Sequence, residues 1–93
     1  MRSVDLAIYA DAVAGEAAAL AARRERERSR LRQAAIERAA RAELPPSVVA
    51  RLDELGLLAT RANGADLREL DRALEAVEQL QAWVEARLAA SAA

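Results

Sequence analysis

The chain has 93 residues, which is the length of one small domain. Its 14 basic and 15 acidic residues leave a net charge of −1, and it has neither histidine nor cysteine. These absences exclude disulfides, thiol chemistry, imidazole catalysis and zinc sites of the usual ligand type. With three glycines, two prolines, no phenylalanine and alanine as its most frequent residue, the composition predicts an all-α protein.

The first predicted element is a long helix over residues 4–43. Ser3 is the expected N-cap, with Asp5 in the electropositive first turn. The helix is expected to stop before Pro45-Pro46, because a residue that precedes proline disfavours the α conformation. Leucine, valine and alanine recur on one face at spacings of three and four as far as Leu20, and that pattern decays from Arg24 onward.

A short second helix is predicted over residues 47–55. Gly56 stands where a left-handed residue commonly ends a helix, and Leu57 supplies the apolar contact that often accompanies such an end. A loop follows up to Asn63-Gly64, a turn signal. Asn63 is also a candidate cap for the third helix.

The third helix is predicted over residues 65–90. Its apolar residues alternate at spacings of three and four, which is the pattern of a coiled-coil-like seam. Leu80 and Trp83 widen the stripe on one side, and Trp83 is a candidate contact residue because tryptophan is enriched among interface hot spots. The seam residues of this helix are Leu67, Leu70, Leu74, Val77, Gln81, Val84 and Leu88, of which Leu67, Leu70, Leu74, Val77 and Val84 are the candidate interface residues.

The unequal lengths of the two long helices favour assembly. At about 1.5 Å per residue the first helix would extend about 60 Å, and a third helix of about 25 residues cannot cover all of it. Either the first helix breaks, at Gly15 or Ser29, or a second chain covers its apolar stripe. We expect the second outcome: an all-α fold of long, short and long helices that forms a helical hairpin or coiled-coil-like bundle and is completed by homodimerisation. The stripe that would mediate it on the first helix is Leu6, Tyr9, Val13 and Leu20.

A charged segment interrupts the apolar face of the first helix between Ala22 and Leu31. Six arginines and two glutamates between residues 23 and 32 leave +4 in ten residues. The arginines point in nearly every direction around a helix, so they form no single phosphate-tracking stripe. Three interpretations stay open for this segment: pairing with acidic residues of the protein itself, binding to an acidic protein or membrane surface, and binding to nucleic-acid phosphates. The arginines concerned are Arg23, Arg24, Arg26, Arg28, Arg30 and Arg32.

The acidic row of the third helix makes internal pairing the leading interpretation. With Leu67 at an a position of the heptad, the e positions are Asp71, Glu78 and Glu85. Antiparallel helices would bring Arg28 toward Asp71 or Glu78, whereas parallel helices would set Arg23 and Arg30 against the same row. The sequence leaves the two orientations open.

The function predicted from these patterns is a non-enzymatic α-helical assembly or adaptor protein that acts through helix–helix contacts, as a homo-oligomer or as a subunit of a larger complex. The alternative is a nucleic-acid accessory factor that uses residues 23–32, which the slightly acidic composition and scarce aromatic residues do not favour. The sequence indicates no catalytic residue, cofactor or metal ligand. Asp5 and Asp11 interrupt the apolar residues near the N-terminus and no run is long enough to span a bilayer, so a cytoplasmic protein is expected.

Overall fold

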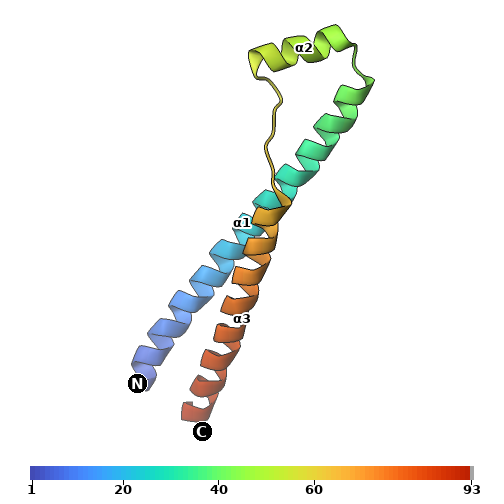
Figure 1. Cartoon of the computed structure of the whole chain (residues 1–93). Helices are drawn as coiled ribbons and strands as arrows, with labels where there is room; N and C mark the ends of the chain where they lie inside the picture. Colours follow the sequence, from blue (N-terminus) through green and yellow to red (C-terminus); the bar gives the residue numbers. More distant parts are fainter. Residues whose placement is uncertain (93) are drawn as a thin grey trace.

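A computed structural model of the chain describes residues 1–92, which form three helices and no strand. Helix α1 is Ser3–Glu43, α2 is Pro46–Leu55 and α3 is Gly64–Ala92. Helices α1 and α3 pack against each other in opposite directions, so both ends of the chain lie at the same end of the molecule and α2 lies at the other (Figure 1). The all-α prediction and the order of long, short and long helices are confirmed.

Helix α1 is continuous through Gly15 and Ser29 and ends at Glu43, where Leu44 is extended (φ −80°, ψ 151°) ahead of the two prolines. The prediction of Ser3 as N-cap is wrong by one residue. The helix already begins at Ser3, because the carbonyl of Arg2 accepts a hydrogen bond from the amide of Leu6 at 3.0 Å.

The predicted C-terminal end of α2 and the predicted cap at the start of α3 are confirmed, whereas α2 begins one residue before the predicted residue 47 and α3 continues to Ala92, two residues past the predicted end. Gly56 is left-handed (φ 65°), and the amides of Gly56 and Leu57 donate to the carbonyls of Asp53 and Leu52 at 3.2 and 3.0 Å. These two bonds satisfy carbonyls that the end of α2 would otherwise leave without donors. At the start of α3, the side-chain oxygen of Asn63 accepts a hydrogen bond from the amide of Ala65 at 2.9 Å.

The core is a narrow seam between α3 and the N-terminal half of α1. Within residues 1–92 the buried apolar side chains are Leu6, Val13, Leu20, Leu74 and Val84, of which Val84 is 1% exposed. The three α1 residues are seven apart, which is the spacing that keeps one helix face toward an antiparallel neighbour. The predicted alternation of three and four therefore identifies the faces that meet.

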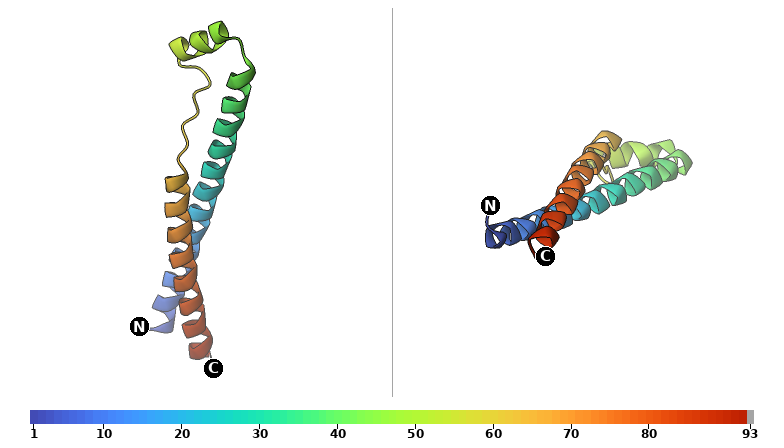
Figure 2. Two further views of the ribbon diagram at one scale, coloured as in Figure 1. Left: turned by 45° about the vertical axis from the view of Figure 1, so that its right-hand side comes forward. Right: turned by 90° about the horizontal axis from the view of Figure 1, so that it is seen from below.

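The expectation that a single chain leaves the stripe of α1 uncovered is wrong for Leu6, Val13 and Leu20, because α3 buries all three. The reason lies in the loop over residues 56–63, which runs extended beside α1 before α3 begins (Figures 1 and 2). Eight residues can reach at most about 26 Å, so the loop can carry the chain past the C-terminal part of α1 and start α3 near the middle. Helix α3 then covers the N-terminal half.

The result is an elongated molecule of 70 × 18 × 15 Å with a radius of gyration of 21.2 Å. A compact chain of this length would have a radius of gyration of about 12 Å. Two regions follow from this shape. The helical hairpin is the N-terminal part of α1, up to residue 30, together with α3. The distal arm is the rest of α1 with α2 and the loop over residues 56–63.

Candidate helix-interaction surface

The apolar residues predicted to form an interface divide into two groups in the structure. The first group lies inside the hairpin and holds α1 to α3. Besides the five buried residues, it includes four half-buried side chains of α3, namely Leu67, Leu70, Val77 and Leu80. These residues pack within the chain, although the half-buried side chains remain partly accessible at the surface.

The second group, Tyr9 and Trp83, remains largely exposed. Tyr9 is 42% exposed and Trp83 is 55% exposed, and both flank the seam. The guanidinium of Arg87 lies over the Trp83 ring at 5.5 Å from its centre, which is a cation–π distance. Tyr9 lines a shallow groove with Val77 and Leu80 of α3. The two aromatic side chains of the protein are thus available for contacts outside the hairpin.

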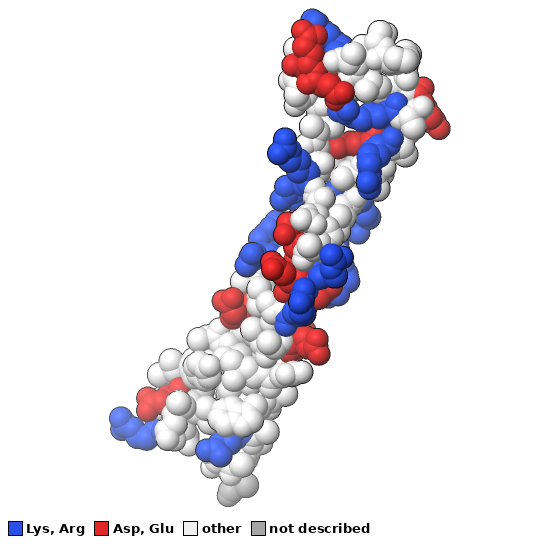
Figure 3. Space-filling view, in the orientation of Figure 1, with Lys and Arg blue, Asp and Glu red and all other residues white. Residues whose placement is uncertain are grey.

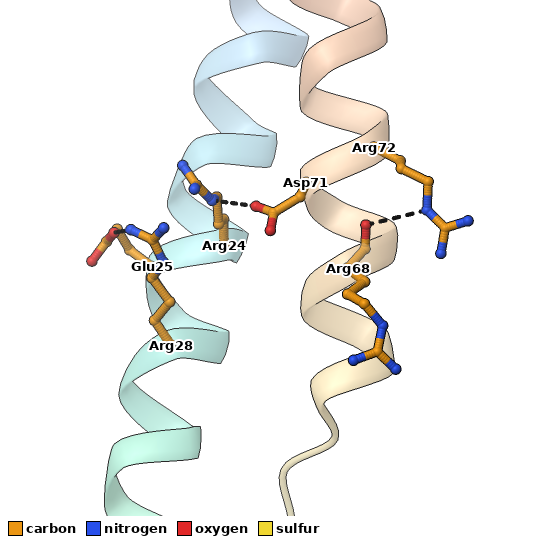
Figure 4. A network of polar contacts seen from close by, with 6 residues as sticks. All are labelled: Arg24, Glu25, Arg28, Arg68, Asp71 and Arg72. Carbon is orange, nitrogen blue, oxygen red and sulfur yellow. Dashed lines mark hydrogen bonds and ion pairs between the residues drawn. The ribbon is translucent and has the colours of Figure 1, made fainter.

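One arginine of the charged segment joins α1 to α3. The Nε atom of Arg24 lies 2.5 Å from a carboxylate oxygen of Asp71, and the side chains are 32% and 44% exposed (Figure 4). The two atoms that meet are shielded from solvent, and neither makes a well-aligned hydrogen bond within the described residues. Because the side chains are partly exposed, we expect the pair to contribute only about 1 kcal/mol or less.

The prediction that antiparallel packing brings Arg28 to Asp71 or Glu78 is wrong. Arg28 pairs instead with Glu25 on its own helix at 3.2 Å, and Asp71 is held by Arg24 (Figure 4). Arg24 follows Leu20 by four residues, so it lies on the face of α1 that packs against α3. Arg28 lies one helical turn further from Asp71 along α1.

The other arginines of the segment have different surroundings. Arg30 donates to the backbone carbonyl of Arg61 at 2.8 Å and lies 3.7 Å from Glu27, and Arg32 donates to the Ser29 hydroxyl at 3.1 Å. Arg23 and Arg26 are exposed and make no ion pair with any residue from 1 to 92. Internal pairing therefore accounts for only part of the charge of the segment.

A groove of about 540 Å³ lies between the two helices where this segment passes α3. Its floor is apolar, with Leu20, Leu70 and Ala73. One wall is mostly basic and belongs to α1, and the other is acidic and belongs to α3. The walls are formed by Arg23, Arg26, Glu27 and Arg30 on α1 and by Asp66 and Glu69 on α3.

Two rows of residues show that this groove and the Tyr9 groove lie on the same face. On α1 the row is Tyr9, Glu16, Arg23 and Arg30, and on α3 it is Asp66, Ala73, Leu80 and Arg87. Members of each row are seven residues apart, so they stack along one edge of a helix. The first two α1 members line the Tyr9 groove and the last two line the charged groove. We call this continuous surface the groove face.

The distal arm is held by polar contacts that the sequence did not reveal. The carboxylate of Glu37 accepts hydrogen bonds from the amide and the hydroxyl of Thr60 at 3.0 and 2.9 Å, and from the side chain of Gln33 at 3.2 Å. Partial burial tends to raise the pKa of Glu37, but these hydrogen bonds and the charge of Arg41 outweigh it and lower the pKa below its usual value. Glu37 therefore holds the loop against α1 in its charged form.

Helix α2 is attached in a similar way. Arg41 forms an ion pair with Asp53, and no residue of α2 is buried. The described part of the distal arm leaves several large apolar side chains exposed, among them Leu58 at 63% and Ile36 at 64%. The others are Leu44, Val48, Leu55 and Leu57. The spacing of apolar residues can identify α2 as amphipathic. It cannot show that the apolar face of α2 has no partner within the described chain.

Charge is unevenly distributed along the molecule. Figure 3 shows a surface with few charges over the end that carries both termini, and basic and acidic side chains crowded over the middle and the α2 end. None of the helices within residues 1–92 is both long and apolar enough to cross a membrane. No cluster of acidic side chains with the arrangement of a metal site occurs in the same residues.

The chain matches no known protein family, and no curated protein or solved structure is significantly similar to it.

Proposed function

We propose that this protein is a non-enzymatic helical assembly or adaptor protein, and that it acts by packing its hairpin against other helices. The observation that carries the proposal is the thin core: only five side chains are buried among the described residues of a molecule 70 Å long. Small domains gain most of their stability from apolar burial, and two helices alone bury little. A third or fourth helix on the groove face would bury the edges of Leu70, Val77 and Leu80.

The mechanism we propose separates affinity from selectivity. Apolar side chains such as Tyr9, Leu80 and Trp83 would supply most of the binding free energy, because aromatic and apolar anchors dominate helix–helix interfaces. The charged walls around Arg23, Arg26 and Glu69 would then select the partner and its register, since charges at an interface rim affect specificity more than affinity. A coiled-coil-like geometry is part of this proposal.

The direct test is the mass of the purified protein in solution. We expect sedimentation equilibrium to show a dimer or higher oligomer at protein concentrations of about 1–100 µM, the range in which moderate helix–helix interfaces assemble. A single species of 10.0 kDa across that range would contradict self-assembly. Tyr9→Ala combined with Trp83→Ala should weaken association without loss of helix content, because both side chains are largely exposed in the single chain.

A second candidate function rests on Arg23 and Arg26, which are exposed and unpaired within the described chain and share one wall of the groove with Arg30. They could contact nucleic-acid phosphates. If they do, binding to mixed-sequence DNA or RNA should weaken with a slope of about −2 in log K against log salt, because each neutralised phosphate releases counterions.

We expect no measurable nucleic-acid binding at about 150 mM salt, where a contact of so few phosphates is largely screened. Submicromolar binding there, abolished by Arg23→Gln with Arg26→Gln but retained by Arg51→Gln, would replace the adaptor proposal with the accessory-factor one. Arg51 is a suitable control because it is an exposed arginine on α2, away from the groove.

A further inference from the structure

The groove face carries a charge pattern that is complementary to itself. At the distal end of the hairpin its α1 edge is basic, through Arg23, Arg26 and Arg30, with Glu27 as the one opposing charge. Its α3 edge at the same level is acidic, through Asp66 and Glu69. Toward the termini both edges are mostly apolar, with Tyr9 on α1 and Val77 and Leu80 on α3, and Glu16 is the one charged residue that lines this part of the groove face.

We infer that the groove face binds the groove face of a second copy of this chain, related by a two-fold axis that runs parallel to the hairpin. This inference rests on the proposed self-assembly and specifies its geometry. Such an axis places α1 of each copy over α3 of the other at the same height. The basic edge then meets the acidic edge twice, and Tyr9 meets the Leu80 and Trp83 side of the other copy.

The other face-to-face arrangement is disfavoured by the same residues. A two-fold axis perpendicular to the helices would place α1 over α1 with the copies running in opposite directions. If that axis passed through the charged groove, Arg23 and Arg26 of one copy would face their own equivalents. If it passed nearer the termini, the arginines would lie over the apolar Tyr9 groove. Like charges placed opposite each other, or charges placed on an apolar surface, oppose association.

The available area is sufficient for such a dimer. The part of α1 within the hairpin, residues 3–30, is about 42 Å long at 1.5 Å per residue. With the 18 Å width of the molecule, the face offers about 750 Å² per copy, close to the roughly 800 Å² that each partner buries in a stable interface. The arrangement also keeps the two α2 helices at one end of the dimer, where their exposed apolar side chains would be neighbours.

Charge reversal tests the pairing of edges. The basic-edge variant carries Arg23→Glu and Arg26→Glu, and the acidic-edge variant carries Asp66→Arg and Glu69→Arg. None of these four side chains forms an ion pair elsewhere in residues 1–92, so both variants should keep their helix content. Alone, each should have a dimer dissociation constant raised about tenfold or more, and an equimolar mixture should assemble as well as the native chain.

The control reverses two charges on the other side of the same helix. Glu75→Arg with Glu78→Arg makes the same charge change on α3 but lies outside both grooves of the groove face. This control should dimerise like the native chain. Because Asp66 stands in the first turn of α3, Glu69→Arg alone serves as a second acidic-edge variant if the double substitution lowers helix content.

The direction of the two copies has its own test. The chain has no cysteine, so Arg51→Cys provides a single site for a spin label on α2. The label-to-label distance should be well under the 70 Å length of the chain, because both α2 helices lie at one end of the dimer. A distance comparable to or longer than that length would overturn the inference in favour of opposed copies.

Two further outcomes would overturn it. Charge-reversed variants that dimerise like the native chain would mean that another surface forms the dimer, while the proposed assembly function would stand. A native chain that stays monomeric at about 100 µM would remove both the dimer and the proposed self-assembly, and would leave the groove face to a different protein.

Discussion

The helical hairpin and the distal arm share the same long helix but are held together by different forces. In the hairpin, α3 buries Leu6, Val13 and Leu20 of α1, and the ion pair between Arg24 and Asp71 adds to that seam. In the distal arm, the loop and α2 are held by the hydrogen bonds of Glu37 and the ion pair of Arg41, and Leu58 is left exposed. Helix α1 therefore packs through apolar contacts in the hairpin and through polar contacts in the distal arm.

This difference indicates unequal stability along the molecule. Apolar burial is a contribution that many contacts share, whereas exposed hydrogen bonds and ion pairs each contribute little and can open one at a time. We expect the hairpin to unfold cooperatively and the distal arm to open locally before it. Hydrogen exchange resolved by residue would show this order directly.

The largest expected effect comes from polar substitution in the hairpin seam. Val13→Glu combined with Leu20→Glu should unfold the hairpin, because each buried carboxylate without a partner costs several kcal/mol and a small domain has only about 5–15 kcal/mol of stability. Far-ultraviolet circular dichroism should show the loss of helix. The loss does not depend on an assembly, because both side chains are buried within one chain.

The matched variant in the distal arm is Val48→Glu with Leu55→Glu. These side chains are 41% and 54% exposed, so the same chemical change should leave the helix content and the melting temperature nearly unchanged. Equal effects of the two double substitutions would show that the two regions do not differ in the way described above.

The next effect in size contrasts two glycines, one in each region. Gly56→Ala should destabilise the distal arm by about 1 kcal/mol, because its left-handed conformation (φ 65°) is strained for a residue with a side chain even though no atom lies within 4 Å of the added carbon. Gly15→Ala should instead stabilise the hairpin by about 0.5–1 kcal/mol, since the position is helical and equally open. Thermal and urea unfolding should show changes in the free energy of unfolding that have opposite signs for the two substitutions.

A smaller effect is expected for the ion pair between α1 and α3. A double-mutant cycle with Arg24→Ala and Asp71→Ala should give a coupling free energy of about 0.3–1 kcal/mol that shrinks as salt is added. The same cycle with Arg28→Ala and Asp71→Ala should give no coupling, because Arg28 pairs with Glu25. Coupling to Arg28 rather than Arg24 would mean that the helices pack in another register.

The smallest effect on the stability of the whole protein is expected at Glu37, where the change should be confined to the loop. Because its pKa is lowered in the folded chain, the charged carboxylate stabilises the loop at pH values above the ordinary range of glutamate. That stabilisation should be lost as the pH falls through the lowered pKa. Hydrogen exchange at the Thr60 amide should then speed up several-fold, after correction for intrinsic rates, while amides of the hairpin seam change little.

The substitution Glu37→Gln should give the same fast exchange at Thr60 at neutral pH and remove the pH dependence. Glu43→Gln is the matched control, because Glu43 is an exposed glutamate on α1 that makes none of these hydrogen bonds. A Thr60 amide that is equally protected in Glu37→Gln and in the native chain would show that the loop is held by something other than this carboxylate.

The three helices and most of their ends could be predicted from local residues alone. Pro45-Pro46 stops α1, the left-handed Gly56 ends α2 and Asn63 caps α3, and each of these signals acts through neighbouring backbone atoms. The spacing of apolar residues also identified the faces of α1 and α3 that meet, because that spacing is a property of each helix alone.

Which residues meet across the chain depends on the tertiary structure. The extended loop over residues 56–63 sets where α3 begins beside α1, and this start determines that Arg24 rather than Arg28 reaches Asp71. The same loop conformation brings Thr60 to Glu37 and lets α3 cover Leu6, Val13 and Leu20. Pairings between distant residues depend on the length and direction of the chain that connects them, and no helical pattern within α1 or α3 contains that information.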